Sequence, residues 1–328
     1  MKPLVKKILL GTLAVPCLAL AGFVGTAQLR WDRTFEAPYP EIRASSDSAV
    51  VARGSYLVNG PAHCSYCHTT TDQWPALDSG AVLPLTGGNR FVLPVGTFIT
   101  PNLTPDVETG IGRRSDAELA RMLRHSVRAD GRAALPFMPF QNMSDDDLTA
   151  IISYLRSREP VRHEVPNHDL TMMGKGLMAF LIEPQGPEGT PPQTSPAQAP
   201  TIARGKYLAN SVANCAGCHT KRSPMDGSAI GEPFAGGMVM EDEKNPDKIF
   251  VTPNLTPDAA TGRIAHWTEE QFVARFRVPR KAFEGSHMPW MAFRRMSDDD
   301  VRAIYRYLNS LSPVANATGP SYQDKPAD

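Results

Sequence analysis

The sequence has no excess of either charge and few cysteines, and both shortages narrow the classes of protein it can belong to. Its 34 lysines and arginines balance 34 aspartates and glutamates, which argues against a nucleic-acid-binding protein that relies on bulk positive charge. Five cysteines in 328 residues are too few for a disulfide-stabilised scaffold. Hydrophobic residues make up 41% of the chain, enough to bury cores in about two domains. The 30 prolines indicate long loops and at least one linker.

The N-terminus has the pattern of a secretory signal or a membrane anchor. Three lysines precede an uncharged run at residues 8–28. A bilayer span needs about 20 residues, whereas the apolar part of a signal peptide needs about 7–15. We therefore expect a membrane helix within residues 1–30, with its lysines in the cytoplasm and the remainder of the chain outside. The alternative is an exported protein released by cleavage at Ala19-Leu20-Ala21.

Four of the five cysteines lie in two copies of one motif, Cys-Ser-Tyr-Cys-His at 64–68 and Cys-Ala-Gly-Cys-His at 215–219. C-x-x-C-H is the attachment signature of c-type haem. Two thiols on one helical turn reach the two vinyl groups of haem, and the adjacent histidine binds its iron. The predicted haem-binding residues are Cys64, Cys67 and His68 in the first motif and Cys215, Cys218 and His219 in the second. A disulfide, a thioredoxin-like pair or a zinc site would leave the repeated histidine unexplained.

The chain also contains an internal repeat of about 150 residues. Both haem motifs follow a segment of the form A-R-G-x-Y-L, and T-P-N-L-T-P-D and M-S-D-D-D each occur twice, at offsets that drift from 151 to 153. Such a drift indicates the same fold twice with small loop insertions. The predicted parts are an anchor or signal at 1–30, a first haem-binding domain at 45–160, a hydrophobic segment and proline-rich linker at 161–197, a second haem-binding domain at 198–313, and a flexible tail at 314–328.

Each repeat is predicted to be all-α, with three helices joined by long loops. The first helix carries Gly54 and Tyr56 and leads into the haem motif. The middle helix begins with a capping box, Ser115 with Glu118 and, in the second repeat, Thr268 with Gln271. The last helix begins after a serine with three aspartates in its first turn, which favours helix capping over a calcium site.

Methionine is the predicted sixth ligand of both irons. Met138-Pro139 and Met288-Pro289 stand just before the last helix of each repeat, where proline stiffens the loop. A methionine ligand raises the haem potential and suits electron transfer. Competing methionines are Met143, Met291 and Met296. The remaining histidines are expected to be surface or packing residues.

These features resemble class I cytochrome c domains, and they are most similar to the multihaem cytochrome c subunits of membrane-bound bacterial alcohol, gluconate and related dehydrogenases. The resemblance rests on A-R-G-x-Y-L before C-x-x-C-H, the Gly87-Gly88 and Gly236-Gly237 loops, T-P-N-L-T-P-D, and Met-Pro before a Ser-Asp-rich helix. It covers residues 45–313. Those relatives commonly carry three haems, whereas this chain has two motifs. A diheme carrier that serves another class of dehydrogenase, such as a molybdenum enzyme, therefore fits equally well.

The resemblance implies a diheme electron carrier of the respiratory chain, anchored to the inner membrane and facing the bacterial periplasm. The expected donor is a dehydrogenase subunit, and the expected acceptor is quinone, another cytochrome or a terminal oxidase. No acid–base constellation accompanies either motif, so no catalytic residue is predicted and the chain alone is not expected to be an enzyme. The alternatives are a diheme peroxidase, a thiosulfate dehydrogenase or a haem subunit of an oxidase complex.

Overall fold

The computed structural model describes residues 3–223, 227–242, 245–278 and 286–326. For residues 3–14 it describes the backbone alone. The first half contains α1 (Pro3–Arg30), α2 (Ser48–Asn59), α3 (Cys64–Cys67), the 3-10 turn η1 (Thr71–Gln73), α4 (Trp74–Asp78), α5 (Asp116–His125), α6 (Asp145–Arg156) and α7 (Met172–Phe180). The second half contains α8 (Ile202–Tyr207), the π-helical turn η2 (Leu208–Val212), α9 (Cys215–Cys218), α10 (Glu269–Arg275), α11 (Trp290–Phe293) and α12 (Asp298–Asn309).

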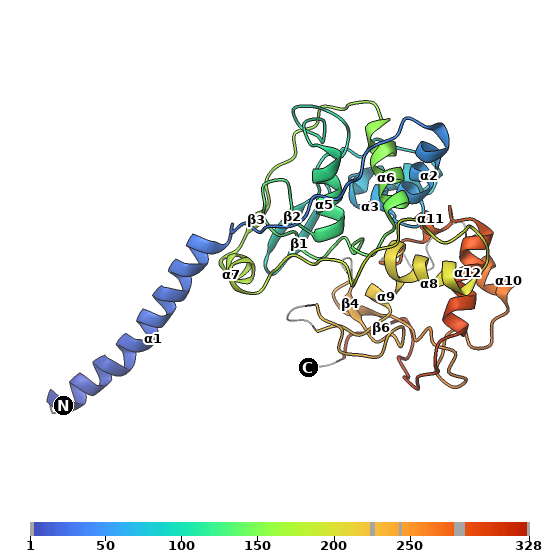
Figure 1. Cartoon of the computed structure of the whole chain (residues 1–328). Coiled ribbons are helices and arrows are strands. Elements are labelled where there is room, and N and C mark those ends of the chain that lie inside the picture. The colour runs from blue at the N-terminus through green and yellow to red at the C-terminus, as the bar shows by residue number, and fades with distance from the viewer. Residues whose placement is uncertain (1–2, 224–226, 243–244, 279–285, 327–328) are drawn as a thin grey trace.

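Helix α1 extends away from the rest of the molecule, and α7 lies beside its C-terminal end (Figure 1). The rings of Phe23 and Phe180 stack with their centroids 5.2 Å apart. Lys175 Nζ donates to Gln28 Oε1 at 3.0 Å, which ties the same two helices at their polar edge. Within the described residues, none of the helices combines the length and the apolar character needed to cross a membrane.

The helix starts predicted from capping residues are confirmed. The capping boxes of Ser115 with Glu118 and of Thr268 with Gln271 open α5 and α10. Helices α6 and α12 follow Ser144 and Ser297, and each has three aspartates in its first turn. The Ser297 hydroxyl caps α12 by accepting from the Asp300 N–H, whereas the Ser144 hydroxyl instead donates to the carboxylate of Asp146.

In each repeat the first helix crosses the last helix at a glycine. A Cβ added to Gly54 of α2 would lie 1.9 Å from the carbonyl oxygen of Ala150 in α6. A Cβ added to Gly205 of α8 would lie equally close to the carbonyl oxygen of Ala303 in α12. Only glycine permits this approach, because any side chain would push the two backbones apart.

An ion pair lies beside each crossing. Arg204 Nε and Asp300 Oδ1 are 2.8 Å apart, and neither side chain is exposed. Arg53 and Asp147 form the equivalent pair at 2.8 Å in the first repeat. The third aspartate of each triplet is therefore a buried structural anion as well as a helix-capping charge.

A tyrosine of each repeat donates a hydrogen bond to the buried aspartate of the other repeat. The Tyr56 hydroxyl donates to Asp300 at 2.6 Å, and the Tyr207 hydroxyl donates to Asp147 at 2.8 Å. Each hydroxyl also accepts from a backbone N–H at the start of the opposite helix, that of Ser297 or Ser144. Burial, with help from Asp300, raises the pKa of Tyr56 to about 12, so its hydroxyl stays a donor at neutral pH. Each repeat thus supplies a tyrosine hydroxyl that makes hydrogen bonds at the start of the last helix of the other repeat.

One continuous apolar core joins the two repeats. Buried Leu57 and Met143 of the first repeat belong to the same cluster as Leu208 and Met296 of the second. The proline-rich segment between the repeats contacts both sides of this joint. The carbonyl oxygens of Pro192 and Gln193 accept from the first two N–H groups of α6, and that of Pro196 accepts from Arg204. The linker is therefore tied to both repeats.

Two small antiparallel sheets depart from the all-α expectation, although the structure is mostly helical. The first has the order β1-β2-β3, formed by β1 (Arg90–Leu93), β2 (Gly96–Ile99) and β3 (Asp169–Leu170). The second has the order β4-β5-β6, formed by β4 (Val239–Glu241), β5 (Lys248–Val251) and β6 (Tyr322–Asp324). Strands this short give little local signal, and the third strand of each sheet comes from a distant part of the chain.

We expect Asp300→Asn to lower the free energy of unfolding by about 3–5 kcal/mol, because it leaves the Arg204 guanidinium buried without a counter-ion. Denaturation of the haem-loaded protein followed by circular dichroism measures this. The matched control is Asp299→Asn, whose carboxylate is 55% exposed and whose loss is expected to cost below about 1 kcal/mol. Equal destabilisation by the two substitutions would contradict a special role for the buried pair.

Candidate functional site

The two cysteines of each motif lie on a one-turn helix that begins at a left-handed residue. His63 precedes α3 with φ of 41°, and Asn214 precedes α9 with φ of 54°. The turn closes when the N–H of His68 donates to the carbonyl of Cys64 at 2.9 Å, and His219 donates to Cys215 at the same distance. This geometry sets both thiols on a single turn with the histidine directly after them.

The histidine of each motif is held by a prolyl carbonyl. His68 Nδ1 lies 2.9 Å from the carbonyl oxygen of Pro101, and His219 Nδ1 lies 3.1 Å from that of Pro253. A carbonyl only accepts, so Nδ1 carries the proton and the Nε2 lone pair of the neutral ring is free to bind a metal. Burial lowers the pKa of both imidazoles, which favours this neutral form. Each ring thus has the tautomer that an iron ligand requires.

A glycine packs against the proline whose carbonyl holds each histidine. The N–H of Gly87 donates to the carbonyl of His68 at 2.9 Å, and a Cβ at this residue would lie 2.4 Å from the carbonyl carbon of Pro101. Gly236 repeats both contacts with His219 and Pro253. Both glycines have positive φ, near 72°. Three segments therefore meet around each histidine, namely the C-x-x-C-H motif, the glycine loop and the T-P-N-L-T-P-D segment.

Met138 and Met288 are half-buried members of the same apolar cluster as Cys64 and Cys215. The competing methionines lie deeper, since Met143, Met291 and Met296 are at most 3% exposed. They fill core positions, which leaves Met138 and Met288 as the methionines of the Met-Pro loops that border accessible space. The assignment of Met138 and Met288 as iron ligands stays a prediction from the sequence.

An arginine secures the end of each methionine loop. Arg124 donates to the carbonyls of Gln141 and Met143 and pairs with Asp145. In the second repeat, Arg277 donates to the carbonyls of Arg294 and Met296 and pairs with Asp298. These residues join the middle helix to the start of the last helix. Sequence reasoning missed them, although their matching place in the two repeats is a signal that could have found them.

Five of the six histidines outside the motifs have a ring nitrogen close to a backbone group. Ring nitrogens of His63, His163, His266 and His287 lie 2.9–3.1 Å from carbonyl oxygens of the chain. His168 Nδ1 accepts from the N–H of Ile99 at 3.2 Å. These contacts fit the prediction that the remaining histidines are packing or surface residues.

The surroundings of both motifs suit a large apolar cofactor joined through thioether bonds. Burial raises the pKa of Cys64 and of Cys215 to about 12, so both are neutral thiols before any cofactor is attached. Apolar side chains that pack on the core yet stay partly exposed are Leu103, Leu119, Leu123 and Met138 in the first repeat and Leu255, Trp267, Met288 and Tyr305 in the second. With a neutral histidine on the same turn, these residues fit haem c.

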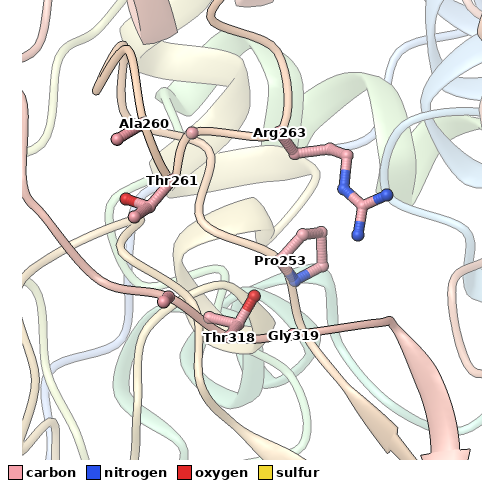
Figure 2. A pocket seen from close by; sticks show the side chains of 8 residues that line it. Pro253, Ala260, Thr261, Arg263, Thr318 and Gly319 are labelled. Atoms are coloured by element: carbon pink, nitrogen blue, oxygen red, sulfur yellow. The ribbon is translucent and has the colours of Figure 1, made fainter.

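A surface pocket lies next to the loop that holds His219 (Figure 2). Pro253, Thr261, Arg263 and Thr318 are among its lining residues. Pro253 is also the residue whose carbonyl binds the imidazole of His219. The pocket is lined by backbone turns and one arginine, without a histidine, cysteine or carboxylate, so it offers no acid–base pair.

The comparison with known proteins agrees with this chemistry. The cytochrome c family model matches residues 202–312. The cytochrome c subunit of the quinone alcohol dehydrogenase of Gluconacetobacter polyoxogenes is 31% identical, over 84% of this chain and 58% of its own length. The gluconate 2-dehydrogenase cytochrome c subunit of Pantoea cypripedii is 29% identical, over 81% of this chain and 60% of its own length. A diheme cytochrome c-type protein of Cereibacter sphaeroides is 27% identical, over 90% of this chain and 97% of its own length.

This chain thus spans a little over half the length of the dehydrogenase subunits and nearly all of the diheme protein. The similarity extends through both repeats, whereas the family model covers the second repeat alone. The chain therefore contains a cytochrome c domain and is similar over most of its length to the cytochrome c subunits of alcohol and gluconate dehydrogenases and to a diheme cytochrome c.

Proposed function

We propose that the chain is a diheme electron carrier in which each repeat is a cytochrome c domain with one covalently bound haem c. The observation that carries the proposal is the same set of contacts found twice. In each repeat a C-x-x-C-H turn carries a histidine whose Nδ1 lies on a prolyl carbonyl, and the Met-Pro methionine is half-buried against the apolar core. A chance motif would not have these surroundings in both repeats.

The chain's own residues bind the cofactor and set its properties. Cys64 and Cys67 would attach the first haem, and His68 and Met138 would bind its iron. Cys215 and Cys218 would attach the second, and His219 and Met288 would bind its iron. When bound, haem c supplies the one-electron iron couple, and thioether ligation by methionine raises its potential. A filled sixth position would leave no open site for a substrate, which suits a carrier.

The electron donor we propose is a dehydrogenase subunit, because two of the similar proteins are named as cytochrome c subunits of dehydrogenases. The acceptor would be quinone, another cytochrome or a terminal oxidase. The near-complete coverage of a diheme cytochrome supports two haems in a carrier of this length.

We further propose that α1 anchors the protein to the inner membrane, with both repeats in the periplasm. Support comes from the three lysines before the uncharged run at residues 8–28 and from the apolar side chains that α1 leaves in solvent. Val15, Leu18 and Leu20 are at least 64% exposed, which is unfavourable for an isolated apolar helix in water. Removal of the segment as an export signal is the alternative.

Mass spectrometry of the denatured protein is expected to find two haems attached. The double substitution Cys64→Ala with Cys67→Ala should leave one haem, because it removes both thiols of the first motif. Cys17→Ala is the matched control, since Cys17 lies outside both motifs and its loss should leave two haems. A single haem in the unmodified protein would contradict the diheme assignment.

The Met-to-iron charge-transfer band of the oxidised protein is expected to have two-haem intensity, and the reduced protein is expected not to bind carbon monoxide. Met138→Ala and Met288→Ala should each remove about half of the band and open one haem to carbon monoxide. Met173→Ala, at an exposed position of α7, should leave both signals unchanged. Carbon monoxide binding by the unmodified protein would instead favour a haem enzyme, and peroxide and thiosulfate turnover would then be assayed.

Deletion of residues 1–30, with a cleavable export signal in their place, is expected to release the haem protein from the membrane fraction into the periplasm. The intact chain should stay in the membrane fraction after a high-salt wash, because burial of apolar side chains is not weakened by salt. Haem staining of the fractions measures this. A periplasmic protein whose N-terminus begins just after Ala21 would contradict the anchor and support signal cleavage.

A further inference from the structure

The Met-Pro methionine lies at a different distance from the last helix in the two repeats. Five positions separate Met138 from Met143 and eight separate Met288 from Met296, although the loop between the middle and last helices has the same length in both repeats. Helix α11 forms in the longer segment, directly after Met288-Pro289, where the first repeat has only a turn. The two proposed iron sites therefore differ on their methionine side, although their histidine sides match.

Helix α11 packs on the haem-attachment segment of the first repeat. Met291 and Ala292 are 3% and 0% exposed and share a cluster with Tyr66 and Leu77. Tyr66 lies inside the first C-x-x-C-H motif. The ring of Phe293 meets that of His63 edge to face, with centroids 5.6 Å apart.

Arg295, just beyond α11, makes hydrogen bonds to the first repeat near the same residues. Its Nη2 donates to the carbonyl oxygens of Leu77 at 3.1 Å and of Ala81 at 2.8 Å. These carbonyls lie at and beyond the C-terminal end of α4, where a cation is favourable. Helix α4 is tied in turn to the first motif, because the indole of Trp74 donates to the carbonyl of Tyr66 at 3.1 Å.

None of the hydrogen bonds described for the first methionine loop reaches the second repeat. Gln141 Nε2 donates to the carbonyl of Met138 at 3.2 Å and to Ser126 Oγ at 2.9 Å, and all three residues belong to the first repeat. The segment after Met288 instead lies between two surfaces. Trp290 and Phe293 pack on Phe276 of their own repeat, while Met291 and Arg295 contact the first repeat.

We infer that the first repeat positions the methionine of the second haem, with Arg295 as the positioning residue that acts through α11 on Met288. The inference rests on the proposed assignment of Met288 as an iron ligand. Its consequence is a one-way dependence between the sites. Loosening the contact between α11 and α4 weakens methionine ligation at the second haem and leaves the first haem unchanged.

The test compares Arg295→Gln with Arg294→Gln in the haem-loaded full chain. Arg294 is the adjacent exposed residue, and its described hydrogen bonds are made by its backbone alone, so it is a matched control. The signals of the two ligated methionines are resolved by paramagnetic NMR and assigned with the Met138→Ala and Met288→Ala proteins. In Arg295→Gln we expect a weakened Met288 signal and about a tenfold larger fraction of second haems that bind carbon monoxide, as for the loss of a charge-assisted hydrogen bond.

Further results test the role of Arg295 and the assignment of Met288 separately. Arg295→Lys should restore most of the Met288 signal, because an ammonium also donates to these carbonyls. An unchanged Met288 signal in Arg295→Gln, or equal weakening at both haems, would overturn the inference while the ligand assignment stands. Absence of a Met288 signal in the unmodified protein would overturn the ligand assignment itself and the inference with it.

Discussion

The contact on which the rest of the structure depends is the crossing of the first and last helices of each repeat at a glycine. Gly54 and Gly205 allow two backbones to meet so closely that a methyl group would overlap a carbonyl oxygen. This approach brings the arginine one position before each glycine to the third aspartate of the last helix. The buried charge is then neutralised within the repeat.

The same crossing also joins the two repeats. The tyrosine two positions after each glycine reaches the aspartate of the other repeat, so each buried aspartate receives an arginine from its own repeat and a tyrosine from the other. A buried carboxylate with several charge-assisted hydrogen bonds is stable only when every partner is in place. The joint therefore holds both haem motifs in a defined relation, which a flexible linker could not do.

The residues around the motif histidine are alike in the two sites, whereas the residues around the Met-Pro methionine differ. Gly87 and Gly236 lie against the prolines whose carbonyls hold His68 and His219, and all of these contacts occur within one repeat. The methionine side of the second site is continuous with α11, which contacts the first repeat. In the proposed diheme carrier, two haems with the same covalent attachment can differ in potential through such surroundings.

Much of the site could be predicted from local patterns. The C-x-x-C-H spacing, the capping boxes of α5 and α10 and the aspartate triplets depend on neighbours within one helical turn, so the residues alone carry the information. The short strands β3 and β6 could not be predicted, because each exists only through pairing with a distant strand.

The sequence by itself determined the two attachment turns, the repeat that contains them and the helices that begin at capping residues, since these depend on covalent spacing and local hydrogen bonds. Only the tertiary structure decided the partners of Asp147 and Asp300, the prolyl carbonyls that orient the histidines, and the contact of α11 with α4. Those contacts join groups from different helices or different repeats. Their energies depend on burial and distance, which exist only after the chain has folded.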